Sequence, residues 1–325
     1  MLKHRCMAVY TEVGDEDLVA FVAAYDIGAV LSCKGIAEGV ENSNFALTTE
    51  RGAYILTLYE KRIDADDLPF FLGLIEHLAA AGVPSPRPVH GRDGSALREL
   101  AGRPAAIVTF LSGMWPRRIT AAHCTEVGRA MAGLHQAGVD FSLARPNGLG
   151  LGAWRPLLER CDPEADDLQF GLVAELDREL KVIEATWPSD LPGGVIHADM
   201  FPDNVFFNQG QVSGVIDFYF ACNDAFAYDI AIALNAWCFA NDGSFDRDLA
   251  ASFILGYSTV RRLEAAEVAA LPVLARGAAM RFLLTRLYDW TNTPANALVT
   301  RKHPMEYFNK LAFHAAATGP ADYGF

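Results

Sequence analysis

Two short segments hold the residues whose types and spacing could do chemistry. The first runs from His197 through Asp199 to Asn204, and the second places Asp217 directly before Phe218. Their order matches the pattern H-x-D-x-x-x-x-N followed by a downstream Asp-Phe pair, which serves phosphoryl transfer from a Mg-nucleotide. The two segments therefore predict that a phosphoryl group is moved from a nucleotide to a hydroxyl group.

The polar residues of these segments divide into a base, two metal ligands and a loop-holding residue. An attacking hydroxyl needs a carboxylate within hydrogen-bond reach, and Asp199 is the candidate catalytic base. Asn204 and Asp217, joined by a predicted hairpin, are candidate ligands of Mg²⁺, a hard cation that prefers oxygen. His197, also counted as catalytic, is expected to hold the loop by hydrogen bonds rather than titrate, and Asp229 to brace it from behind. Each residue alone could be an ordinary cap, but the joint arrangement is specific.

The elements that must position these residues divide the chain into a small mixed lobe and a larger helical one. Periodicity and turn residues predict, for the first, a helix over 15–25, strands over 30–33, 44–49, 54–59 and 105–110, and a helix over 68–81. For the second they predict helices over 123–136, 164–186, 224–240, 246–257 and 264–287, with short strands at 205–207 and 212–216. We therefore predict an N-terminal nucleotide-binding lobe over 1–108, a hinge over 109–113, and a catalytic and acceptor-binding lobe over 114–325.

A glycine-rich stretch between the first two predicted strands is a candidate phosphate-binding loop. It includes Gly35, Gly39 and Asn44, and its backbone N–H groups could hold phosphate oxygens. An ordinary hairpin loop is the alternative, because the stretch lacks G-x-G-x-x-G. The chain also has no G-x-x-x-x-G-K-[ST], which excludes a P-loop enzyme.

The predicted hinge is a candidate site for the adenine base. The predicted buried strand over 105–110 ends with Thr109 and Phe110 and leads into Leu111, and backbone groups of such an edge segment could pair with the base. The alternative is a linker between the lobes that makes no ligand contact.

Composition and charge narrow the class of protein. The 325 residues carry a formal net charge of −13, which argues against nucleic-acid binding because no basic stripe could neutralise phosphates. Six cysteines without a C-x-x-C pair indicate free thiols in a reducing cytosol. No signal peptide is recognised, and the longest apolar run, 225–240, contains Asp229 and Asn235, which favours a buried helix over a membrane span. We expect a cytoplasmic protein with a small-molecule substrate and no membrane or nucleic-acid partner.

Several segments resemble known families. The catalytic core of the aminoglycoside-phosphotransferase-like, choline-kinase-like superfamily is similar to segments 197–204, 216–218 and 227–231. Bacterial homoserine kinases of this superfamily are similar, more narrowly, to segments 41–45, 56–61, 68–71 and 281–289. The resemblance implies an α+β, two-lobed protein-kinase-like fold, with Asp199 as base and Asn204 and Asp217 on Mg²⁺. The narrower resemblance implies ATP-dependent phosphorylation of the side-chain hydroxyl of L-homoserine, giving O-phospho-L-homoserine for threonine biosynthesis.

One position departs from the superfamily pattern. Thr57, counted here among the nucleotide-binding residues, stands where most members carry the strand lysine that binds the nucleotide phosphates. Phe71 stands about where that lysine's glutamate partner would lie, so both halves of the ion pair are replaced together. Our hypothesis is that Lys34 or Lys61 reaches the phosphates instead, or that backbone groups and Mg²⁺ suffice.

Other functions stay open at the level of the sequence. The same chemistry on choline, an aminoglycoside or a sugar is the nearest alternative, and the acidic composition would suit polycationic acceptors. Homoserine needs a cation for its carboxylate, and Arg281 or Arg286 is the candidate, although both could simply end a helix. A nucleotide-binding pseudokinase is a further alternative that rests on Thr57 alone. A protein kinase is disfavoured because no activation segment ending in A-P-E follows Asp217.

Overall fold

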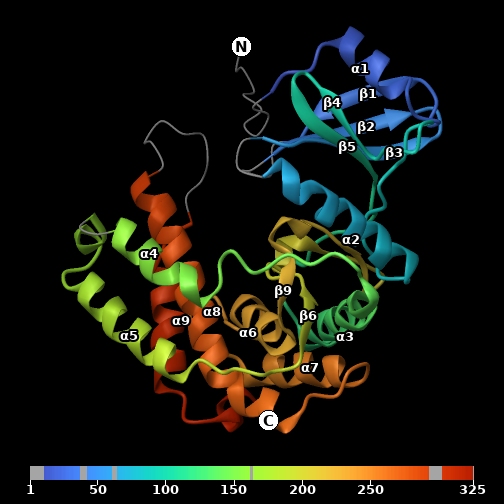
Figure 1. The fold of residues 1–325 in the computed structure, drawn as a ribbon. Coiled ribbons are helices and arrows are strands. Elements are labelled where there is room, and N and C mark those ends of the chain that lie inside the picture. The colour runs from blue at the N-terminus through green and yellow to red at the C-terminus, as the bar shows by residue number, and fades with distance from the viewer. Residues whose placement is uncertain (1–10, 37–41, 61–63, 162–163, 293–301, 325) are drawn as a thin grey trace. The chain divides into compact units, whose positions relative to one another are not determined.

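The computed structural model describes residues 11–36, 42–60, 64–161, 164–292 and 302–324. The chain forms two compact units, Met1–Ser112 and Gly113–Phe325, which are drawn in Figure 1. The assignment of residues 109–113 as a hinge, with lobes on either side of it, stays a prediction.

The first unit is built on an antiparallel sheet with the strand order β1-β2-β3-β5-β4. Its elements are α1 (Asp15–Val22), β1 (Val30–Gly35), β2 (Ser43–Thr49), β3 (Gly52–Leu58), α2 (Leu68–Ala80), β4 (Leu97–Leu100) and β5 (Arg103–Thr109). Alternate residues of the strands, such as Phe45, Leu56 and Ile107, form one core with apolar residues of α1, including Phe21. Thr57 lies on the other face of the sheet, where Asn44 and Ala106 are its cross-strand neighbours.

The second unit is mainly helical. Its helices are α3 (Ala121–Ala137), α4 (Leu151–Cys161), α5 (Leu172–Thr186), α6 (Phe226–Trp237), α7 (Arg247–Ser258), α8 (Ala265–Asn292) and α9 (Met305–Ala316). Two short antiparallel ladders accompany them, β6 (Gly193–Ile196) with β9 (Cys222–Ala225) and β7 (Val205–Asn208) with β8 (Gln211–Val215). Every residue of α6 except Ala236 is buried, as expected for a helix that is apolar all round. The α6 helix is thus the core on which the site is built.

Helices α3 and α7 pack unusually closely. A Cβ atom added to Gly256 on α7 would lie 1.9 Å from the backbone oxygen of Thr125 on α3, and one added to Gly128 on α3 would lie 2.1 Å from the oxygen of Phe253. The two glycines therefore let the helix backbones touch. This contact brings residues further along the two helices, His135 and Tyr257, within hydrogen-bond distance.

Some predicted elements differ from those observed. The helix expected over 164–186 is divided: a 3-10 turn covers Glu164–Asp167, and α5 begins only at Leu172, after the left-handed Gly171. The helix expected over 224–240 is shorter, because Cys222–Ala225 pairs with β6 as a strand. Pattern reasoning also missed α4, which contains Pro156.

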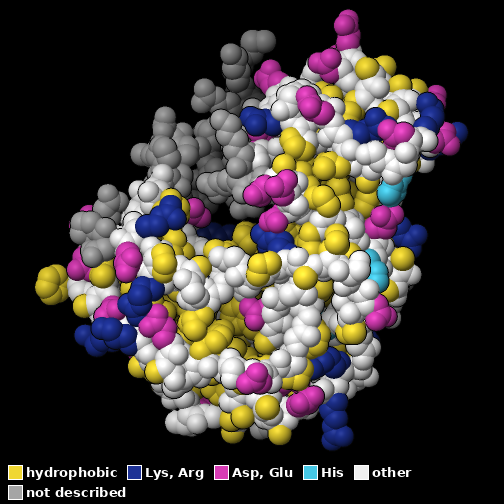
Figure 2. Space-filling model, viewed as in Figure 1, with side chains coloured by type: hydrophobic (Ala, Val, Ile, Leu, Met, Phe, Trp, Pro, Cys, Tyr) yellow, Lys and Arg dark blue, Asp and Glu magenta, His cyan; other side chains and the backbone are white. Residues whose placement is uncertain are grey.

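The longest helix bears on the membrane prediction. Among the described residues, α8 is the one helix long and apolar enough to cross a membrane, but 61% of its most apolar window is buried inside the structure. Core helices of soluble proteins meet the same criterion, so the finding is weak support for a span. On the face drawn in Figure 2, acidic and basic side chains are interspersed and no continuous basic stripe is seen among the described residues. The cytoplasmic location and the absence of nucleic-acid partners stay predictions.

Candidate active site

The predicted catalytic loop leaves the end of β6 and is held by the first turn of α6. Asp229 accepts the backbone N–H of His197 at 2.9 Å with Oδ2 and that of Ala198 at 2.8 Å with Oδ1. Between them, Ala198 has φ +60°, a left-handed conformation that costs a non-glycine residue roughly 1–2 kcal/mol. Asp229 therefore braces the loop from behind, as the sequence predicted.

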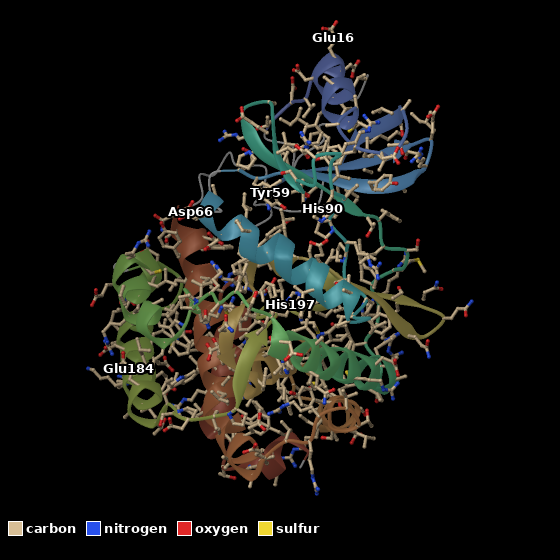
Figure 3. The ribbon with its side chains drawn as sticks, turned by 45° about the vertical axis from the view of Figure 1, so that its right-hand side comes forward. Glu16, Tyr59, Asp66, His90, Glu184 and His197 are labelled. Atoms are coloured by element: carbon tan, nitrogen blue, oxygen red, sulfur yellow. The ribbon has the colours of Figure 1, made fainter. Side chains whose placement is uncertain are left out.

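His197 joins the catalytic loop to the end of β8. Its Nε2 lies 3.0 Å from the carbonyl oxygen of Ile216, which can only accept, so Nε2 carries the proton. The unprotonated Nδ1 then accepts the backbone N–H of Asp199 at 3.2 Å. Burial lowers the pKa of His197, which agrees with a neutral ring. Figure 3 draws His197 among the side chains of the second unit, where its side chain is buried.

The candidate base and the two candidate metal ligands lie together. Asn204 donates from Nδ2 to the backbone oxygen of Asp199 at 2.9 Å and to its Oδ2 at 3.1 Å. The backbone of Asn204 in turn accepts the N–H of Ile216 at 3.0 Å, which brings Asp217 beside it. Burial, and then the negative charge of Asp217, raise the pKa of Asp199 well above its usual value, while Arg281 opposes the rise.

The donor atoms at this site suit Mg²⁺. Both hydrogen bonds of the Asn204 carboxamide leave from its nitrogen, so neither uses its oxygen. Mg²⁺ is usually held by one or two protein oxygen ligands together with waters and substrate phosphates. Within the described residues there is no cluster of three or more His, Cys, Asp or Glu that could hold a metal ion by itself. Asn204 and Asp217 therefore fit a cation that is shared with nucleotide phosphates.

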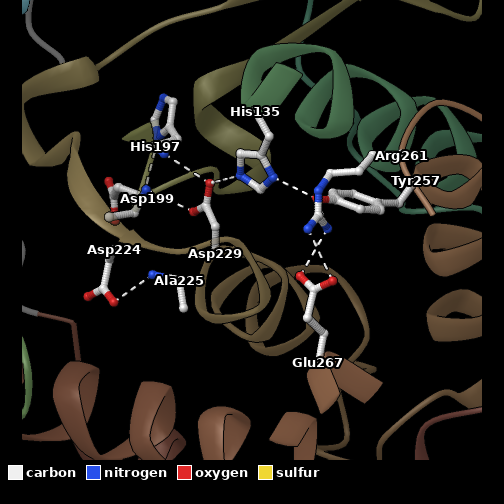
Figure 4. Close-up of polar contacts among 10 residues, drawn as sticks. His135, His197, Asp199, Asp224, Ala225, Asp229, Tyr257, Arg261 and Glu267 are labelled. Carbon is white, nitrogen blue, oxygen red and sulfur yellow. Dashed lines mark hydrogen bonds and ion pairs between the residues drawn. The ribbon is translucent and has the colours of Figure 1, made fainter. Parts of the chain in front are cut away.

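A buried polar chain that the sequence did not reveal continues behind Asp229. His135 Nε2 lies 2.9 Å from Asp229 Oδ2, and His135 Nδ1 lies 2.8 Å from the hydroxyl of Tyr257 (Figure 4). Arg261 donates to that hydroxyl at 3.2 Å and to both oxygens of Glu267 at 2.9 and 3.1 Å. We call His135, Tyr257, Arg261 and Glu267 the polar chain. Their spacing in the sequence matches no motif, so only the fold brings them together.

The polar chain fixes proton positions as well as side chains. The carboxylate of Asp229 only accepts and the guanidinium of Arg261 only donates, so His135 donates from Nε2 and accepts the Tyr257 hydroxyl proton at Nδ1. Burial alone would raise the pKa of Asp229, but the hydrogen bonds from His135 and from the backbone N–H of His197 hold that pKa below its usual value. Asp229 is thus kept ionised and able to hold the loop.

In the first unit, Thr57, which stands where most superfamily members carry a lysine, is hydrogen-bonded to Asn44, another candidate nucleotide-binding residue. Thr57 is 4% exposed and donates its hydroxyl proton to Asn44 Oδ1 at 2.8 Å. Lys34 pairs with Ala46, two residues from Asn44 on β2, so Lys34 shares the sheet face of Asn44 and Thr57. Gly35 ends β1, whereas Gly39 and Lys61 fall outside the described residues.

Two backbone N–H groups of the predicted hinge already donate hydrogen bonds to other residues of the first unit. The N–H of Thr109 donates to Arg87 at 2.9 Å, and the N–H of Phe110 donates to Ala53 at 3.3 Å. Pairing with a base would thus fall to the carbonyl groups of this segment and to Leu111. The role of the three residues in nucleotide binding stays a prediction.

The two predicted substrate arginines stand in different surroundings. Arg286 forms an ion pair with Glu306 at 2.7 Å and lies over the ring of Tyr307. Arg281 is 2% exposed and donates from Nη1 to the carbonyl oxygen of Ala198 at 2.7 Å. Arg281 therefore contacts the catalytic loop directly, while Arg286 is tied to α9.

A comparison with known proteins decides the family. A model described as "Phosphotransferase enzyme family" matches residues 32–265. The chain belongs to this family. It is 60% identical over 324 residues to a homoserine kinase of Paramagnetospirillum magneticum, covering 98% of this chain and 99% of that relative. It is 59% identical over 318 residues to a homoserine kinase of Rhodospirillum rubrum, with 98% and 99% covered.

Solved structures of phosphotransferases share the fold. An amicoumacin kinase in complex with AMP-PNP has a TM-score of 0.67 at 17% identity, covering 92% of this chain and 91% of that one. A spectinomycin phosphotransferase has a TM-score of 0.68 at 12% identity, with 97% and 98% covered. The predicted superfamily and the aminoglycoside-phosphotransferase-like fold, with a β-rich N-terminal and a helical C-terminal region, are confirmed.

Proposed function

We propose that this phosphotransferase moves the γ-phosphoryl group of ATP to the side-chain hydroxyl of L-homoserine, giving O-phospho-L-homoserine and ADP in threonine biosynthesis. The reaction type rests on one observation: the carboxylate of Asp199, hydrogen-bonded to Asn204, lies beside Asp217 in a single polar site. The acceptor is supported by relatives named homoserine kinase that are 57% to 60% identical to this chain over nearly its whole length.

Each side chain of the site has a distinct task in this proposal. Asp199 orients the acceptor hydroxyl and takes its proton as the new O–P bond forms and the bond to the β-phosphate oxygen breaks. Asn204 and Asp217 would hold Mg²⁺, which neutralises phosphate charge when bound. His197 keeps the loop attached to β8, and Asp229 fixes its backbone.

The acceptor and the nucleotide each need charged partners in the protein. Homoserine carries a carboxylate and an ammonium group, so its pocket needs at least one cation and one anion. Arg286 is a candidate for the cation, and its present partner Glu306 is half-exposed. Lys34 is the candidate cation for the ATP phosphates, because the Thr57 position offers only a hydroxyl that already donates to Asn44.

The reaction is tested by measuring ADP release with Mg-ATP and L-homoserine. Asp199→Asn should lower kcat by about 10²–10⁴-fold, since it removes the proton acceptor but keeps the shape of the side chain. The matched control is Asp203→Asn, four residues along, whose side chain is 60% exposed and lies 3.7 Å from Lys302. Equal rates for wild type and Asp199→Asn would remove Asp199 from its role.

The acceptor is tested with a panel of choline, kanamycin, a hexose and L-homoserine. Transfer to homoserine alone is expected. Transfer to choline or kanamycin but not homoserine would overturn the acceptor and leave the reaction type standing. Nucleotide binding without turnover on any alcohol would instead favour the pseudokinase alternative.

A further inference from the structure

Arg281 is a buried cation that has no carboxylate partner in the part of the chain that the structure describes. It lies on α8 with 2% of its surface exposed. Among the described residues its guanidinium forms no ion pair, and its Nε has no hydrogen-bond partner. Burying a charge without pairing it is costly, so such a residue is not explained by stability alone.

The contacts of Arg281 join the two loops that carry the candidate catalytic carboxylates. Its Nη1 donates at 2.7 Å to the carbonyl oxygen of Ala198, the residue before Asp199. Its guanidinium carbon lies 5.6 Å from the ring centroid of Phe220, which ends the 3-10 turn that follows Asp217. A single side chain therefore contacts both loops.

Both loops hold a strained residue next to these contacts. Ala198 has φ +60° and Asp217 has φ +65°, and neither is a glycine. Such conformations persist only where the surroundings over-determine them. At Ala198 the restraint is two-sided: Asp229 accepts its N–H at 2.8 Å and Arg281 donates to its carbonyl oxygen. Turning the residue to a relaxed conformation would break a charge-assisted hydrogen bond on each side.

We propose that Arg281 is a positioning residue for phosphoryl transfer, which holds the strained Ala198 and the turn after Asp217 so that the two carboxylates keep their separation. It acts through Ala198 rather than by touching the acceptor, and the proposal rests on the function proposed above.

The test compares Arg281 with another arginine of the same helix. Arg276 lies on α8 and is paired with Glu179 on α5, so its variants control for the loss of a partly buried arginine. Arg281→Met should lower kcat by about 10²-fold, the loss expected when a catalytic group is displaced by about 1 Å. Arg281→Lys keeps the positive charge but lacks the guanidinium group that reaches both loops, so its kcat should fall about tenfold. The KM values for ATP and homoserine should stay within about threefold, and Arg276→Met and Arg276→Lys should keep kcat within about threefold.

A second variant tests the strain itself. Glycine adopts a positive φ without strain, so Ala198→Gly should make the loop less dependent on Arg281. The loss of kcat caused by Arg281→Met should then be at least about fivefold smaller in the Ala198→Gly background than in the wild type. An equal loss in both backgrounds would overturn the proposal.

Other outcomes are equally decisive. A higher KM for homoserine with unchanged kcat would assign Arg281 to acceptor binding and overturn its positioning role. If Arg281→Met does not fold, Arg281→Lys decides, and a kcat equal to that of Arg276→Lys overturns the proposal. Absence of transfer by the wild-type protein would contradict the proposed function instead, and this is seen before any variant is made.

Discussion

Replacing Tyr257 by phenylalanine removes one hydroxyl from the polar chain and little else. Tyr257 is fully buried, and its hydroxyl lies between His135 Nδ1 at 2.8 Å and Arg261 Nη1 at 3.2 Å. Burial raises the pKa of this hydroxyl, so it stays protonated and donates to His135. In Tyr257→Phe, the Nδ1 atom of His135 is left buried without a donor, while Arg261 keeps both bonds to Glu267.

The free energy lost can be worked from these contacts. A buried polar atom left without its partner costs about 1–3 kcal/mol, so we expect the free energy of unfolding to fall by about 2 kcal/mol. This corresponds to about a 30-fold change in the unfolding equilibrium. We also expect kcat to fall about three- to tenfold at unchanged KM, because His135 no longer holds Asp229 in one fixed arrangement behind the catalytic loop.

The stability assay is urea unfolding followed by tryptophan fluorescence. All five tryptophans lie after residue 112, so the signal reports the second unit alone. The matched control is Tyr323→Phe, whose buried hydroxyl lies 2.9 Å from His314 Nδ1 and, among the described residues, has no hydrogen-bonded link to Asp229. The control should lose similar stability and keep its kcat. The reasoning is refuted if Tyr257→Phe loses less than about 0.5 kcal/mol, or if its kcat equals that of the control.

Three further predictions concern packing, nucleotide binding and pH. Gly256→Ala should lower the free energy of unfolding by about 3 kcal/mol or more in the same urea assay, because its Cβ atom would clash with the backbone of α3. The control is Gly133→Ala on α3, whose Cβ atom would meet nothing within 4 Å, and it should be neutral or slightly stabilising. Lys34→Ala should raise the KM for ATP about tenfold, whereas the control Lys181→Ala, at an exposed lysine, should not. An unchanged KM for ATP in Lys34→Ala would show that Lys34 does not bind the nucleotide phosphates. Burial lowers the pKa of His314 to about 3, below its value in the unfolded chain. The free energy of unfolding should therefore fall as the pH falls from about 6.5 towards 3, by up to about 1.4 kcal/mol per pH unit. Urea titrations at several pH values should show a flatter dependence of this free energy on pH for His314→Gln.

The residues of the site that the sequence could predict are those close together along the chain. His197, Asp199 and Asn204 fall within eight residues, and a hairpin of two short strands returns the chain to Asp217. Their types and spacing carry the chemistry before any fold is known. Asp229 was also accessible, because a carboxylate in the first turn of an apolar helix has a limited number of roles.

The polar chain could not be predicted, because its members are joined only by packing. His135 lies 94 positions from Asp229 and 122 from Tyr257 along the chain, and a lone histidine on an amphipathic helix carries no signal of its partner. The contact depends on two glycines that let α3 and α7 touch, and their spacing matches no motif. Pro156 hid α4 for a different reason, since proline inside a helix weakens the pattern from which helices are predicted.

The α8 helix holds Ala198 from both sides, and this has a consequence for hydrogen exchange. Glu267, near its start, is linked through the polar chain to Asp229 and so to the N–H of Ala198, while Arg281, further along the same helix, binds the carbonyl oxygen of Ala198. The connections form a closed ring that passes through α8. The loop therefore cannot open by a local fluctuation unless this ring breaks. The amide of Ala198, although it lies in a loop, should belong to the slowest-exchanging group of the second unit and exchange together with α8.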